Sequence, residues 1–166
     1  MSPETIFGIH LVLGYVAWVL CFRVDLWPRL QSMDRLEAER AIATLHSFRF
    51  FGLVFILPGI VGPNLPAGFA VFAAYGDFAT GVLALLALLA VRMRPLFWFF
   101  VVAFNVVGTA DILVDYYHAV QGKLPAIPGQ LGATYAIAII YVPLLMITHI
   151  AAFYQLARAP RHQAAG

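Results

Sequence analysis

Five long apolar segments, separated by short polar or proline-rich breaks, make up most of this sequence. A helix that crosses a membrane needs about 20 mostly apolar residues, since it rises about 1.5 Å per residue through a hydrocarbon layer about 30 Å thick. Five segments meet this requirement, at residues 5–22, 42–61, 68–91, 96–120 and 131–156. We therefore predict an all-α fold, a polytopic integral membrane protein built as a five-transmembrane-helix bundle.

The composition agrees with a membrane location and argues against a nucleic-acid-binding protein. Of the 166 residues, 63% are hydrophobic and only 11% are charged, whereas a soluble domain carries about 25% charged residues. The net charge is +2 and no basic stripe is interleaved with aromatic residues, so we expect the lipid bilayer, and no nucleic acid, among the partners. Residues 1–157 form one predicted domain, and residues 158–166 a disordered tail.

The basic residues predict how the five spans are oriented. Arginines lie in or beside residues 23–41, between the third and fourth spans and after the fifth, whereas Lys123 lies alone on the opposite side. Loops rich in Lys and Arg stay in the cytoplasm, which places the N-terminus outside and the C-terminus inside a multi-pass protein of the cell inner membrane. Residues 23–41 are then a cytoplasmic amphipathic connector. No basic residue precedes the first apolar segment, so we expect a retained span and not a cleaved signal peptide.

Acidic and histidine side chains in the fourth predicted span mark a candidate site. Charged groups inside a bilayer are costly and usually face the bundle interior or a water-filled cavity. Asp111, Asp115 and His118 fall within an arc of about 60° on a helical projection. They therefore form one polar stripe, in the outer half of the predicted bundle.

Two other predicted spans bring polar groups to the same depth. Asp77 enters the third span at the level of Asp111, and His10 enters the first span at the level of Asp115. We therefore expect an outward-facing cavity that binds a cation, a metal or a proton-coupled small molecule. The expected ligand- or proton-binding residues are Asp77, Asp111, Asp115 and Asn105.

The same cluster is compatible with a divalent metal or with a purely structural role. Carboxylate and imidazole groups suit iron, manganese or zinc, and the candidate metal ligands are His10, Asp111, Asp115 and His118. Alternatively, these side chains hydrogen-bond one another and hold the helices together. The sequence does not choose between the two interpretations.

Two further hypotheses rest on other parts of the chain. His46 and His149 enter the second and fifth spans near the cytoplasmic side, and a pair of histidines across helices can hold haem b in a redox protein. Arg49, close to His46, is interpreted as an interfacial group that reaches toward water. A non-catalytic membrane subunit or assembly factor would instead use the 23–41 connector to dock on a partner subunit or a second copy. Whether the protein is an enzyme stays open, because the sequence has no G-x-S-x-G or H-E-x-x-H motif.

Overall fold

The computed structural model describes residues 1–158, and this part of the chain is helical without a β-strand. Four of its helices are long and apolar enough to cross a membrane, and they cover Pro3–Ser32, Ala67–Leu89, Arg94–Gln121 and Ile137–Ala157. The all-α class is therefore confirmed, with four candidate membrane-spanning helices where five were predicted. The predicted disordered tail falls, from residue 159 onwards, outside the described residues.

The first helix continues well beyond the predicted end of the first span. It begins at α1 (Pro3–Cys21), passes through a π-helical turn (η1, Phe22–Leu26) and continues as α2 (Trp27–Ser32). The Ser2 hydroxyl caps the start by accepting a hydrogen bond from the Thr5 amide at 3.2 Å. The segment predicted as an amphipathic connector, 23–41, is thus largely helical, and only residues 33 and 34 separate this helix from the next.

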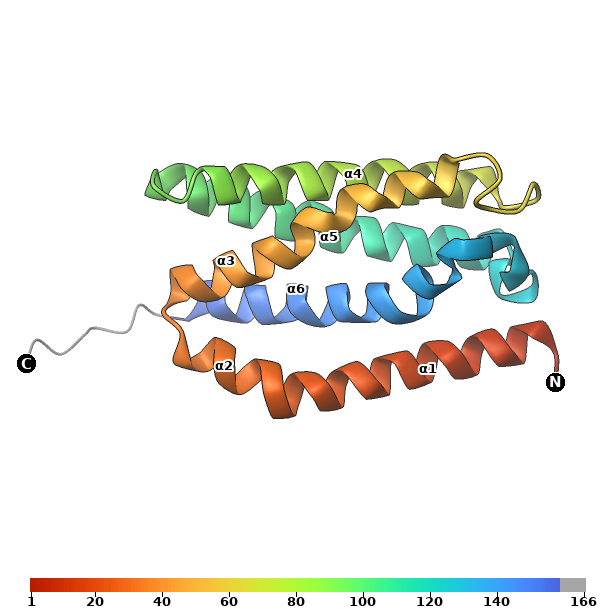
Figure 1. Cartoon of the computed structure of the whole chain (residues 1–166), viewed down its shortest axis with the longest axis horizontal. Helices are drawn as coiled ribbons and strands as arrows, with labels where there is room; N and C mark the ends of the chain where they lie inside the picture. The colour runs from red at the N-terminus through yellow and green to blue at the C-terminus, as the bar shows by residue number, and fades with distance from the viewer. Residues whose placement is uncertain (159–166) are drawn as a thin grey trace, which may run out of the picture.

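The second predicted span, residues 42–61, is not a single α-helix. Helix α3 (Arg35–His46) starts at Asp34, whose side chain accepts a hydrogen bond from the Glu37 amide at 2.8 Å, and it gives way to a 3₁₀ helix, η2 (Ser47–Ile56). A 3₁₀ helix rises about 2 Å per residue, so a short segment covers a long distance. Figure 1 shows that α3 and the segment after it run along the whole length of the bundle.

Two antiparallel helices, α4 (Ala67–Leu89) and α5 (Arg94–Gln121), pack against each other, and α4 also packs against η2. Small residues on α4 allow this close approach. Gly81 faces the Phe50 backbone so closely that a Cβ atom there would collide with it. These two helices coincide, within a few residues, with the predicted third and fourth spans.

The fifth predicted span begins later than expected. Residues 124–134 form the short 3₁₀ helices η3 (Leu124–Ala126) and η4 (Pro128–Thr134), and the long helix starts only with the π-helical turn η5 (Ile137–Tyr141). Helix α6 (Val142–Ala157) follows directly, with Pro143 in its first turn. A local change from π- to α-helical geometry thus occurs beside this proline.

The buried apolar residues form two cores with a polar layer between them. One core includes Ala38 and Ile42 of α3, and the other includes Phe55 of η2. His46 and Arg49 lie between these positions along the chain and are almost fully buried. Figure 1 places the N-terminus at one end of the bundle and the end of α6 at the other, with the polar layer between.

Candidate functional site

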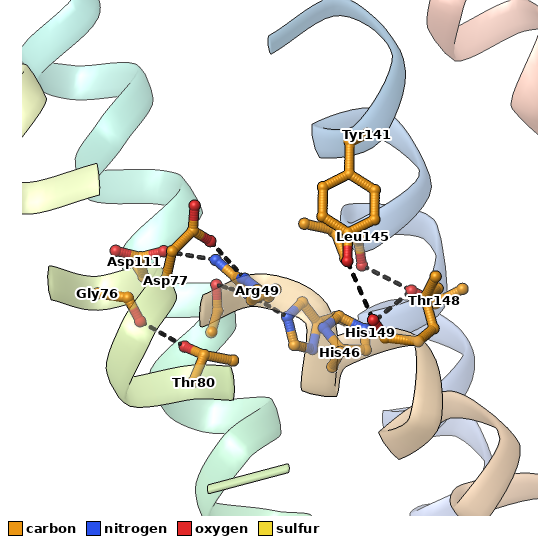
Figure 2. Close-up of polar contacts among 12 residues, drawn as sticks. His46, Arg49, Gly76, Asp77, Thr80, Asp111, Tyr141, Leu145, Thr148 and His149 are labelled. Carbon is orange, nitrogen blue, oxygen red and sulfur yellow. Dashed lines mark hydrogen bonds and ion pairs between the residues drawn. The ribbon is translucent and has the colours of Figure 1, made fainter. Parts of the chain in front are cut away.

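Arg49 is the centre of the polar layer. Its side chain is 1% exposed, and Nε donates a hydrogen bond to Asp77 Oδ1 at 2.6 Å. Nη2 donates to Asp111 Oδ2, and Nη1 donates to the Gly108 carbonyl at 3.3 Å. Figure 2 shows the guanidinium lying between the two carboxylates on one side and the histidines on the other. A buried guanidinium between two carboxylates satisfies the requirement that charges removed from water be paired.

His149 connects this ion cluster to α5. Its Nε2 lies 3.1 Å from Arg49 Nη1 and its Nδ1 lies 2.8 Å from Asn105 Oδ1. Because a guanidinium can only donate, Nε2 accepts the first bond, and Nδ1–H therefore donates to Asn105. The Asn105 amide nitrogen in turn donates to the Val101 carbonyl at 2.9 Å. The network fixes a neutral His149 in a single tautomer.

His46 lies beside His149 but has a separate hydrogen bond. The ring centroids of the two histidines are 4.1 Å apart. His46 Nε2 is 3.0 Å from Thr148 Oγ1, whose own proton is directed to the carbonyls of Leu144 and Leu145. Nε2–H is therefore the donor, and His46 Nδ1 is left as a lone pair with no hydrogen-bond partner among the described residues.

Glycines make the room that this cluster needs. A Cβ atom at Gly76 would collide with the Asp111 carboxylate, and one at Gly52 would collide with Asp77. At Gly108 a Cβ would lie 2.5 Å from Arg49 Nη1 and 2.6 Å from His149 Nε2. The polar layer therefore depends on three positions that carry no side chain.

Replacing Gly108 by alanine should destabilise the protein by about 1–3 kcal/mol, because overpacking a filled interior costs this much. The new methyl group would also lie 2.7 Å from Thr80 Cγ2, so it would meet three side chains at once. Gly8→Ala is the matched control, since a Cβ at Gly8 meets nothing within 4 Å and alanine favours a helix by about 1 kcal/mol over glycine. Unfolding in detergent, followed by circular dichroism, measures both; a stabilising Gly108→Ala substitution would contradict the packing described here.

A cavity of about 130 Å³ lies beside the ion cluster and extends to Phe7 in the N-terminal part of α1. Its polar wall consists of Arg49, Asp77, Asp115 and Tyr116, whereas the rest of its lining is apolar and includes Phe7, Leu11, Phe55, Phe69 and Leu124. The Tyr116 hydroxyl is 2.7 Å from the hydroxyl of Tyr15 on α1. Asp115 Oδ1 is buried and has no hydrogen-bond partner among residues 1–158.

The four predicted metal ligands are not brought together. His10 Nδ1 is 2.8 Å from the hydroxyl of Tyr135, and the His118 ring stacks on Phe72 at 4.6 Å between centroids. Asp111 pairs with Arg49. Across the described part of the chain, no group of three or more His, Cys, Asp or Glu side chains is arranged to hold a metal ion.

The two predicted haem ligands do come together, as direct neighbours. His46 and His149 are 0% and 1% exposed, and their rings are in contact. An iron held by both imidazoles needs a macrocycle between the rings, so this packing does not favour the haem hypothesis. The other predicted site residues, Asp77, Asp111 and Asn105, all belong to the network around Arg49.

Sequence reasoning missed the central role of Arg49 and the burial of Glu39. Arg49 was interpreted as an interfacial group, but it lies well inside the second predicted span, and that position was the available signal. Glu39 falls within the predicted cytoplasmic amphipathic connector, yet it is 0% exposed. Burial raises the pKa of the Glu39 carboxyl to about 8, against an opposing effect of nearby Arg35. No periodicity marked this residue, because the surrounding segment is mostly polar.

Comparison with known proteins places the chain in a family. Comparison with curated proteins and with solved structures finds no match. A protein-family model does match, over residues 6–157. This range includes every residue of the ion cluster and of the cavity wall described above. Because the match covers most of its length, the chain belongs to the family described as Domain of unknown function (DUF8737).

Proposed function

We propose that this is a multi-pass inner-membrane protein that binds a small organic cation in an outward-facing cavity. In this proposal residues 42–61, which comprise the end of α3, η2 and the turn after it, form the second of five crossings. This puts the N-terminus outside and the end of α6 in the cytoplasm. Support comes from the exposed apolar side chains of α1, including Val12, Leu13 and Leu20, which a bilayer would cover. The distribution of the basic residues favours the same orientation.

The observation that carries the ligand proposal is the free carboxyl oxygen of Asp115. A buried polar atom without a partner is rare, and it commonly marks a functional site or a bound water or ion. Asp115 also lines the cavity, whose wall is mostly apolar. A ligand that fits has an apolar body and one group that donates a hydrogen bond to a carboxylate.

The charges around the cavity favour a cation over an anion. One guanidinium, Arg49, faces three carboxyl groups, Asp77, Asp111 and Asp115. Arg49 pairs with the first two, so Asp115 is the carboxyl left to receive a positive group. A bare divalent metal fits less well, because Arg49 already occupies the two inner carboxylates. The volume is close to that of an engineered apolar cavity of about 150 Å³ that accepts benzene, which limits the ligand to about one ring.

Benzylamine is therefore the probe for this cavity, with benzyl alcohol as its neutral analogue. We expect the protein in lipid nanodiscs to bind benzylamine at least about tenfold more tightly than benzyl alcohol, since a charge pair out of water contributes more than the ~1.4 kcal/mol that tenfold requires. Asp115→Asn should remove this preference while leaving benzyl alcohol binding unchanged. Isothermal titration calorimetry measures both affinities.

The matched control is Asp25→Asn, which changes an exposed carboxylate of η1 far from the cavity and should keep the preference. Equal affinity for the two probes in the native protein would refute an organic-cation site. A preference that survives Asp115→Asn would place the cation at another carboxyl.

A further inference from the structure

A second cavity, of about 440 Å³, lies between the first helix and α3, and we call it the α1–α3 groove. Helices α1 and α3 both pack against α6, and Figure 1 shows α6 running between them. The groove is lined by Trp18 and Arg29 of the first helix, Ile42 and Leu45 of α3, and Leu144 of α6, among others. It shares no lining residue with the cation cavity, and its volume is in the usual range for a small-molecule site.

The interior of the groove suits a hydrocarbon chain. Its two uncharged polar side chains are already hydrogen-bonded to backbone carbonyls. Trp18 Nε1 donates to the Ile140 carbonyl at 2.7 Å, and Thr148 Oγ1 bonds to the carbonyls of Leu144 and Leu145 at 2.9 and 3.0 Å. The rest of the lining is apolar apart from Arg29. A polar ligand would therefore lose its bonds to water without replacing them.

Arg29 is the one charged residue that lines the groove, and it is exposed. Among residues 1–158, the ion pairs with carboxylates are made by Arg49 alone. Asp25, four residues before Arg29, is exposed and does not pair with it. The guanidinium is therefore available to an anionic group at the mouth of the groove. Phosphate is well matched to it, because a guanidinium can donate two parallel hydrogen bonds to phosphate oxygens.

The length of the groove matches one leaflet of a bilayer. The helix Pro3–Ser32 has 30 residues, hence a length of about 45 Å, which is the thickness of a bilayer with its headgroups. Trp18 is at the middle of this helix, and Arg29 is one turn from its end. The eleven residues from Trp18 to Arg29 rise about 16 Å, and half of the hydrocarbon layer is about 15 Å thick. The groove thus runs from the midplane to the headgroup layer.

We propose that the α1–α3 groove holds one acyl chain of an anionic phospholipid, whose phosphate pairs with Arg29. The lipid belongs to the cytoplasmic leaflet, because Arg29 is at the cytoplasmic end of the first span in the proposed orientation. This inference rests on the membrane-spanning arrangement of the proposed function and not on the cation cavity. A bound lipid of this kind would fill the space between α1 and α3.

Native mass spectrometry of the detergent-purified protein tests the proposal. Dioleoyl phosphatidylglycerol and dioleoyl phosphatidylcholine have the same tails, but only the first has a net negative charge. The native protein should bind one phosphatidylglycerol about fivefold more tightly than phosphatidylcholine, the contribution of one basic side chain near a membrane surface. Arg29→Gln should remove this preference. The matched control is Arg92→Gln, which changes an exposed arginine in the turn between α4 and α5 and should keep it.

A second pair of variants tests the place of the acyl chain. Ala41 lines the groove and is exposed, so Ala41→Trp should abolish the binding of both lipids by occupying the space of the tail. Ala79→Trp changes an exposed alanine of α4 outside the groove and should bind both lipids as the native protein does. Lipid binding that survives Ala41→Trp would overturn the proposal.

Two other results would also overturn it. Equal affinity of the native protein for the two lipids, or a preference that survives Arg29→Gln, would mean that Arg29 does not hold the headgroup. A lipid-free dimer that Ala41→Trp converts to a monomer would assign the groove to a second copy of the chain.

Benzylamine titration of the same preparations separates this proposal from the cation cavity. A native-like benzylamine preference in Ala41→Trp shows that the bundle is folded, so lost lipid binding is then a lost groove. Lipid preference without benzylamine preference would uphold the groove and remove the cation cavity, and the opposite result would do the reverse. Native protein that is released from cells without detergent would refute the membrane arrangement, and the lipid proposal with it.

Discussion

Replacing Arg49 by methionine should lower the free energy of unfolding by about 3–5 kcal/mol, the usual cost of leaving a buried charge unpaired. The substitution removes the partner of both Asp77 and Asp111, and it also takes a hydrogen bond from His149. Methionine fills much of the same volume, so the loss comes from charge and not from a large cavity. Unfolding in mixed micelles of non-ionic detergent and dodecyl sulfate, followed by circular dichroism, measures the change.

Two further variants show whether charge pairing is the cause. The triple substitution Arg49→Met, Asp77→Asn and Asp111→Asn should recover most of the lost stability, because a buried ionic network can often be replaced by neutral groups at little cost. Arg40→Met changes an exposed arginine of α3 and should change stability by less than about 0.5 kcal/mol. If the triple variant is no more stable than Arg49→Met, shape and not charge would explain the effect.

Glu39→Gln should be more stable than the native protein at pH 8, by on the order of 4 kcal/mol, and equally stable near pH 4. The carboxyl of Glu39 has a pKa of about 8 in the folded protein, against 4.5 when unfolded. Between these values the folded state keeps a proton that the unfolded chain has released. The unfolded state therefore binds fewer protons, and native stability falls as the pH rises from about 4.5 to about 8. Glutamine has no proton to lose, so the stability of the variant does not fall in this way as the pH rises.

Unfolding curves of the native protein and the variant at pH 5, 6, 7 and 8 measure the predicted divergence. Glu37→Gln serves as the control, since its side chain is exposed and its removal should leave the pH dependence unchanged. Parallel curves for the native protein and Glu39→Gln would mean that Glu39 is ionised in the folded state, in disagreement with its burial.

The apolar segments by themselves determined the all-α class and the approximate positions of four long helices. This works because hydrophobic length is a local property and the cost of an unpaired backbone in an apolar environment leaves few alternatives to a helix. The same reasoning identified Asp77, Asp111, Asn105 and His149 as polar residues that the bundle interior has to accommodate. Their burial follows from their positions within apolar runs.

Only the tertiary structure decided what these residues bind. The sequence paired acids with histidines on one helix face, whereas the structure pairs Asp77 and Asp111 with Arg49, which comes from a different element. That pairing depends on the change from α-helix to 3₁₀ helix after His46 and on close approach at Gly76 and Gly108. Both are properties of three elements packed together, so no periodicity within a single segment could predict them. The burial of Glu39 has the same origin, since a mostly polar segment is covered by neighbours distant in sequence.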